Sequence, residues 1–208
     1  MKRAALLPLF LALASCSSTP ATGERPAQSA AEGERLSAFL KANMHPRGQA
    51  KLDRIELDDV QRLCNATADN PPRGEAQRIE QAQLKSIPFP GGSLLGDWKA
   101  GEKIAQSGRG MTWNDKPGAP SGGSCYNCHE ISPKEEAHGT IGPSLAAFGK
   151  KRGNGPDVQR YVYGKIYNAK AYNACSQMPR FGHSGTLTEQ QMKDLTALLL
   201  DPASPVNQ

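Results

Sequence analysis

The chain has 208 residues, and its 38% hydrophobic and 22% charged residues are typical of a soluble globular protein. If Lys2 and Arg3 leave with the leader described below, 23 basic residues remain against 20 acidic ones, a net charge of about +3. A charge this small and this dispersed argues against nucleic acid as a partner. It can still steer docking onto an acidic protein surface.

Residues 1–16 predict an export signal, because a basic start is followed by an apolar stretch over residues 4–14 and then by small residues. The apolar stretch is shorter than the ~20 residues that a membrane span requires. Residues 13–16 also resemble a bacterial lipobox, in which Cys16 becomes lipidated. Ordinary cleavage nearby, for example after Ala14, is the alternative. We therefore expect a periplasmic protein, either free or held by a lipid anchor at Cys16.

A polar linker is expected over residues 17–33 and a helical extension over residues 34–90. Within the extension, apolar residues recur at helical spacing in residues 34–43, 58–66 and 75–84. Such short helices bury too little apolar surface to fold independently, so we expect them to pack on the domain that follows. The sequence of the extension shows no cluster of chemically active residues.

The second part of the chain, residues 91–208, predicts further short helices and no strand pattern. Two are expected over residues 97–107 and 157–167. The last helix is the best specified, because Thr188 and Gln191 match a capping box at its start. Apolar residues then continue along one face until an Asp-Pro pair ends the helix. An all-α domain is therefore predicted.

The run Cys125-Tyr126-Asn127-Cys128-His129 is the strongest chemical signal in the chain. In this pattern the two cysteines bond the vinyl groups of one haem c, and the histidine ligates its iron. A zinc site would need a second ligand pair, and none follows at usable spacing. A redox dithiol would favour a βαβ pattern, whereas the flanking sequence is rich in glycine and proline. We expect one covalently bound haem c.

An early helix, the haem motif and an amphipathic last helix occur in the order typical of class I cytochromes c. In that fold the first and last helices cross closely, and Gly101 would allow such an approach. The predicted fold is therefore an all-α class I cytochrome c fold with an N-terminal helical extension. Proteins of this class also place a proline carbonyl on the ring nitrogen of the haem-ligating histidine. Pro143 in the run Gly142-Pro143-Ser144-Leu145 matches that position, although a simple turn would use the same residues.

The second axial ligand must come from the remaining histidines and methionines of the mature chain. These are His45, His138, His183, Met44, Met111, Met178 and Met192. Met178 is favoured because the proline after it promotes an extended backbone that can present the thioether to iron. A core methionine is the alternative use, and His183 is the next candidate ligand. A Met/His pair raises the reduction potential relative to two histidines and leaves no open site on iron, which suits electron transfer.

Cys64 and Cys175 are left as an even pair in an oxidising compartment, so a disulfide between them is expected. It would tie the extension to the haem domain. The alternatives are that Cys175 is a reactive thiol or a haem ligand.

Residues 94–207 resemble the X subunit of the SoxAX cytochrome complex of periplasmic sulfur oxidation. The resemblance rests on residues 142–145, residues 163–168 (Tyr-Gly-Lys-Ile-Tyr-Asn) and residues 201–207. The run Ala-Tyr-Asn-Ala-Cys-Ser-Gln-Met-Pro-Arg-Phe-Gly at residues 171–182 is its most distinctive part. The lipobox departs from the soluble periplasmic form usual in that family.

The resemblance implies an electron-transfer subunit that pairs with an A-type subunit, SoxA, which carries the catalytic haem. The complex is an L-cysteine S-thiosulfotransferase type of enzyme, which oxidatively couples thiosulfate to a cysteine of the carrier SoxYZ. Electrons then leave through the haem of the X subunit to a downstream cytochrome c. By matching, Cys125 and Cys128 hold the haem, His129 and Met178 ligate iron, and no catalytic residue is expected in this chain. The alternative function is a free periplasmic electron-shuttle cytochrome for another oxidoreductase.

Overall fold

The structure, a computed structural model, describes residues 25–208. The expected export signal, Cys16 and the first part of the linker lie outside the described residues. The α-helices are α1 (Arg25–Asn43), α2 (Asp59–Ala66), α3 (Arg73–Lys85), α4 (Trp98–Gln106), α5 (Phe148–Arg152), α6 (Pro156–Tyr167) and α7 (Glu189–Leu200). Short 3₁₀ turns lie at η1 (Leu52–Ile55), η2 (Cys125–Asn127), η3 (Ala169–Ala171) and η4 (Pro205–Asn207). Residues 25–208 contain no β-strand, so the predicted all-α class is confirmed.

The helices expected from apolar spacing are all present, with ends shifted by a few residues. The largest difference is α1, which begins at Arg25 rather than at residue 34. Helix α5 was not expected from the sequence, because its five residues are too few to show a helical period. None of the helices within the described part of the chain combines the length and apolar character needed to cross a lipid bilayer.

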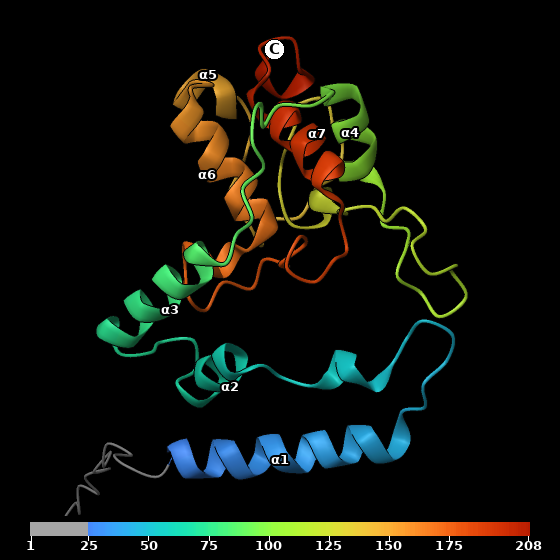
Figure 1. Cartoon of the computed structure of the whole chain (residues 1–208), viewed down its shortest axis with the longest axis vertical. Coiled ribbons are helices and arrows are strands. Elements are labelled where there is room, and N and C mark those ends of the chain that lie inside the picture. Colours follow the sequence, from blue (N-terminus) through green and yellow to red (C-terminus); the bar gives the residue numbers. More distant parts are fainter. Residues whose placement is uncertain (1–24) are drawn as a thin grey trace, which may run out of the picture.

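The centre of the haem domain is the crossing of α4 and α7 (Figure 1). A Cβ added at Gly101 of α4 would lie 2.2 Å from the carbonyl oxygen of Asp194 in α7, so only glycine allows this approach. The predicted capping box is present, with Thr188 accepting from the backbone of Gln191 and the Gln191 side chain accepting from the backbone of Thr188. Local caps and one close helix contact thus position the two helices expected to cross.

One continuous apolar core lies under these helices. Its largest fully buried side chains are Tyr163, Ile131, Leu198, Leu200 and Val206. The C-terminal tail closes the core, because its polar side chains satisfy carbonyls at the end of α7. Ser204 Oγ donates to the Leu198 carbonyl at 2.5 Å and Asn207 Nδ2 donates to the Leu199 carbonyl at 3.1 Å. The tail is therefore part of the domain.

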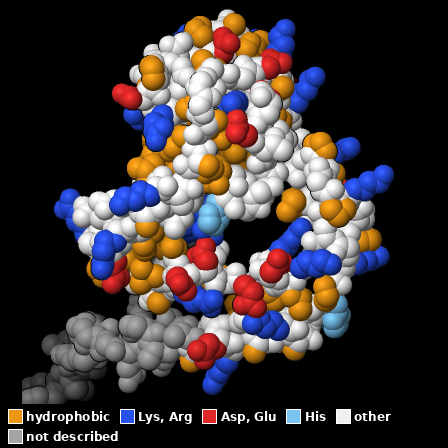
Figure 2. Space-filling view, in the orientation of Figure 1, with side chains coloured by type: hydrophobic (Ala, Val, Ile, Leu, Met, Phe, Trp, Pro, Cys, Tyr) orange, Lys and Arg blue, Asp and Glu red, His pale blue; other side chains and the backbone are white. Residues whose placement is uncertain are grey.

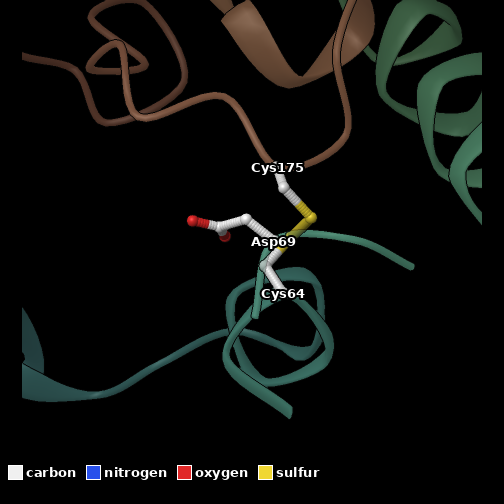
Figure 3. A group of neighbouring side chains, drawn as sticks. All are labelled: Cys64, Asp69 and Cys175. Atoms are coloured by element: carbon white, nitrogen blue, oxygen red, sulfur yellow. A yellow bond between two sulfur atoms is a disulfide. The ribbon is translucent and has the colours of Figure 1, made fainter. Parts of the chain in front are cut away.

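The segment from α1 to α3 forms an arm beside this domain (Figure 1). Figure 2 shows an opening between part of the arm and the domain, so the two touch along only part of the arm. Part of the contact is a small apolar cluster in which Cys64 of α2 packs with Ala174 and Cys175. Cys64 and Cys175 form the expected disulfide, and that prediction is confirmed (Figure 3). Cys175 is therefore not a free thiol.

Candidate haem site

The haem motif begins where the chain leaves α4. The backbone N–H groups of Gly123 and Ser124 donate to the carbonyls of Ile104 and Ser107, at 2.8 and 2.9 Å. Ser124 has left-handed backbone angles, with φ of 48°, and starts the single turn of η2, Cys125–Asn127. The glycine-rich approach to the motif is therefore held in place by backbone hydrogen bonds to the end of α4.

The two motif cysteines lie at either end of a tight turn. The backbone N–H groups of Cys128 and His129 donate to the Cys125 carbonyl, at 3.1 and 3.0 Å. Both thiols are partly buried, and neither is in a disulfide. Burial raises the pKa of the Cys125 thiol to about 12, so this group is neutral at physiological pH. A neutral thiol is a poor redox nucleophile, which favours the thioether role over the dithiol alternative.

The His129 ring is oriented by the segment that carries Pro143. Its Nδ1 atom lies 2.8 Å from the Pro143 carbonyl oxygen, and a carbonyl can only accept. Nδ1 therefore carries the proton, and Nε2 keeps the lone pair that a metal needs. Gly142 makes room for the ring, because a Cβ there would lie 2.2 Å from Cε1 of His129. Its backbone N–H also donates to the Cys128 carbonyl at 2.8 Å, which joins the two segments.

Met178 lies in the loop between η3 and α7, where the backbone is not helical. Its side chain is partly buried against the main core, as are those of Cys125 and Leu145. The same core thus borders both the motif and Met178. The other candidate in this region, His183, has its Nε2 atom 3.3 Å from a guanidinium nitrogen of Arg180. Because arginine only donates, Nε2 of His183 accepts and its Nδ1 carries the proton, so neither ring nitrogen keeps a free lone pair for iron. This contact favours Met178 as the iron ligand.

The remaining candidates have other surroundings. His45, Met44 and His138 are exposed, as expected for residues outside the site. Met192 is buried in the core together with Leu187, and the two residues occupy the flanking positions of a hydrophobic staple at the start of α7.

Tyr126, inside the haem motif, is a residue whose role the sequence did not indicate. Its side chain is buried in the main core, and its hydroxyl has no hydrogen-bond partner within the described residues. A buried hydroxyl without a partner is costly, unless a group bound next to it supplies one. Burial and the negative charges of Glu135 and Glu102 raise the pKa of Tyr126 to about 12, so the hydroxyl remains a donor. This donor, the two thiols, the imidazole and the thioether fit a haem carrying acidic side groups.

Sequence reasoning also missed contacts between the extension and the Met178 loop. Asp58 forms a salt bridge with Arg180, across 122 residues of chain. The capping box at Asp58 and Gln61 marks the start of α2 in the sequence, but no local signal reveals which distant residue its carboxylate meets.

Comparison with known proteins identifies the domain that carries the motif. The cytochrome c family model matches residues 99–201, which include most of α4, the Cys-x-x-Cys-His motif and α7. The chain therefore contains a cytochrome c domain, and members of this class carry covalently bound haem c.

The similarity to one relative extends over nearly the whole chain. An "Uncharacterized lipoprotein" of Aquifex aeolicus (strain VF5) is 32% identical over 192 residues, which cover 88% of this chain and 91% of the relative. The chain belongs to the same family as this lipoprotein. Among solved structures, the "Crystal structure of SoxXA from P. pantotrophus" matches with a TM-score of 0.39 and 24% identity, covering 56% of this chain and 87% of the other.

Proposed function

We propose that this protein is a monohaem c-type cytochrome in which Cys125 and Cys128 bond the haem and His129 and Met178 are the axial ligands. The observation that carries the proposal is the 2.8 Å contact between His129 Nδ1 and the Pro143 carbonyl, which leaves Nε2 available for iron. The haem, when bound, supplies a one-electron redox centre. With two protein ligands its iron has no open site for a substrate, so the role is electron transfer.

The domain that performs this role spans residues 91–208, and residues 34–90 form the extension packed on it. Cys125 would give its neutral thiol to the covalent bond with the haem, and Pro143 holds the imidazole in one tautomer. The buried Tyr126 hydroxyl has no partner among residues 25–208 and would be available to donate to an acidic group of the cofactor. Each of these residues acts before any electron moves, by fixing the cofactor's position and surroundings.

The partner that supplies electrons is proposed from the sequence resemblance to the X subunit of SoxAX. In this role the protein pairs with a SoxA-type haem subunit, which carries the catalytic haem. It accepts electrons from the coupling of thiosulfate to a cysteine of the SoxYZ carrier, and it passes them to a downstream cytochrome c. The run at residues 171–182 supports this role, because it is the most distinctive part of the resemblance to the X subunit.

The periplasm is the proposed location, with a lipid anchor at Cys16. The lipobox-like residues 13–16 support the anchor. The description of the Aquifex relative as a lipoprotein supports it independently. Intact mass measurement of the mature protein tests this directly, because a diacylated N-terminus at Cys16 and a free N-terminus at Ser15 differ by the mass of the lipid and of one serine residue.

Haem reduction by thiosulfate tests the proposed partnership. Full-length haem-loaded protein is mixed with thiosulfate and SoxYZ, with and without a SoxA-type subunit, and reduction is followed by visible absorption. We expect reduction only when the SoxA-type subunit is present. Failure of that subunit to bind the protein, or to make its haem reducible, would contradict the SoxAX role and favour a free shuttle cytochrome. The electron-transfer function would stand in either case.

A further inference from the structure

The loop of residues 174–180, which carries Met178, is held by the N-terminal extension rather than by the haem domain alone. The extension side chains that contact it are Asp58, Cys64, Asp69 and Glu80. They come from α2, α3 and the segments that flank them, and they reach the loop on both sides of Met178. Figure 3 shows the disulfide between Cys64 and Cys175, with Asp69 beside it.

Two of these contacts precede Met178. Glu80 accepts a hydrogen bond from the Ala174 backbone N–H at 3.1 Å, and Cys64 forms the disulfide with Cys175. Both cysteines are buried, with exposed fractions of 2% and 7%. The loop is therefore covalently attached to α2 three residues before the proposed ligand.

The other two contacts involve residues immediately around Met178. Asp69 Oδ2 accepts from Gln177 Nε2 at 3.0 Å. Arg180 Nη2 donates to Asp58 Oδ2 at 2.5 Å, and the Arg180 side chain is only 14% exposed. Asp58 is itself fixed, because its other carboxylate oxygen accepts from the Gln61 backbone N–H at 2.8 Å as the cap of α2.

The loop has little internal structure of its own to hold Met178. Residues 176–180 form no helix, and the Met178 backbone N–H meets only the Ser176 hydroxyl, at 3.3 Å. Segments with few backbone hydrogen bonds open more easily than the helices around them. Contacts from a separate element, placed before and after one residue, restrict such opening.

From this arrangement we propose that the N-terminal extension is a positioning clamp, which holds the Met178 thioether at the haem iron by fixing both flanks of its loop. The positioning residues are Asp58, Cys64, Asp69 and Glu80, and none of them contacts the cofactor in this role. The inference rests on the proposed ligation by Met178. It gives the extension a function in setting how often the iron loses its sulfur ligand.

Asp58→Asn in the full-length haem-loaded protein is the primary test. Asparagine is as good a helix cap as aspartate, so the variant removes the charge that meets Arg180 and keeps the start of α2. The matched control is Asp59→Asn on the neighbouring residue, whose exposed carboxylate lies 3.8 Å from Arg62 and does not reach the loop. The readouts are the weak sulfur-to-iron charge-transfer band of the ferric protein, the reduction potential, and the rate at which imidazole binds the ferric iron.

We expect Asp58→Asn to raise the imidazole-binding rate about threefold, the size expected for a partly exposed ion pair. The double variant that carries Cys64→Ala and Cys175→Ala should raise the imidazole-binding rate more than about tenfold, because it removes the covalent attachment. Both variants should weaken the charge-transfer band and lower the potential, whereas Asp59→Asn should match the wild type. In a Met178→Ala background, Asp58→Asn should have no further effect on imidazole binding. If Asp58→Asn acted through a general loss of stability, it would still raise the imidazole-binding rate in the Met178→Ala background.

Wild-type imidazole rates and an intact band in Asp58→Asn and in the cysteine variant would overturn the clamp. If the cysteine variant does not fold, as judged by circular dichroism, Asp58→Asn alone decides. An unchanged spectrum in Met178→Ala would instead refute the ligation on which the inference rests, and that result is distinct from failure of the clamp.

Discussion

Replacing Cys64 and Cys175 together with alanine removes the cross-link between α2 and the loop before Met178. The two residues are 111 positions apart, so the disulfide closes a loop of more than half the chain. A cross-link of that span reduces the entropy of the unfolded chain enough to stabilise the fold by about 5 kcal/mol. Small proteins have a total stability of about 5–15 kcal/mol, so a loss of this size is between about a third and all of it.

Equilibrium unfolding in urea, followed by far-ultraviolet circular dichroism, measures this loss on the haem-loaded protein. The alanine variant also loses two buried sulfur atoms, because both side chains lie in the small cluster around Ala174. Wild-type protein in a strong reductant provides the matched control, since it keeps both thiols and loses only the bond. All samples are compared in the ferrous state, so that the reductant does not change the haem.

The reduced wild type should show nearly the full loss, with the alanine variant slightly lower because its side chains are smaller. A loss below about 1 kcal/mol in the reduced wild type would refute the reasoning from loop closure. Such a result would mean that the unfolded chain is already compact across this span, so that the bond restricts little.

Three further predictions concern single sites. Met178→Ala should abolish the low-spin Met/His spectrum and lower the reduction potential, and an unchanged visible spectrum would refute the assignment. Gly142→Ala should displace the His129 ring and reduce the haem content of the purified protein, because the new Cβ would lie 2.2 Å from Cε1; normal haem content with an unchanged potential would contradict this. Burial would raise the pKa of Asp58, but the Gln61 backbone N–H and the Arg180 guanidinium outweigh it and hold the pKa below its ordinary value. The stability that Asp58 contributes is therefore complete above a pH of about 4 and is lost as the pH falls through the lower folded pKa. The free energy of unfolding of wild type should exceed that of Asp58→Asn above that pH, and the difference should shrink as the pH falls below it. A difference that is equal at all pH values would argue against the ion pair.

Local features of the sequence predicted the parts of the site that depend on near neighbours. The Cys125–His129 spacing identifies the haem attachment, because the two thiols and the imidazole act within one turn of chain. The capping box at Thr188 and Gln191 located the start of α7 for the same reason. Helix α5 was missed because so short a segment carries no period, and its place depends on packing against α7 and the tail.

Contacts between distant residues depended on the folded structure. The pairing of Cys64 with Cys175 could be expected from the cysteine count, but the meeting of Asp58 with Arg180 and of Asp69 with Gln177 could not. These polar residues carry no periodic signal, and the residues they contact are more than a hundred positions away. The extension was accordingly expected only to pack on the domain, whereas the structure shows it contacting the loop of the proposed ligand.

The sequence by itself determined that this protein is an all-α c-type cytochrome with one haem attachment motif, because helix periodicity, caps and the Cys-x-x-Cys-His spacing are all local. Tertiary structure decided which ring nitrogen of His129 carries the proton, through the Pro143 carbonyl, and which side chains surround Met178. It also decided what the extension contacts. The physical reason is that hydrogen bonds and ion pairs act over a few ångströms in space, and only the folded chain brings residues 58, 69 and 80 that close to residues 174–180.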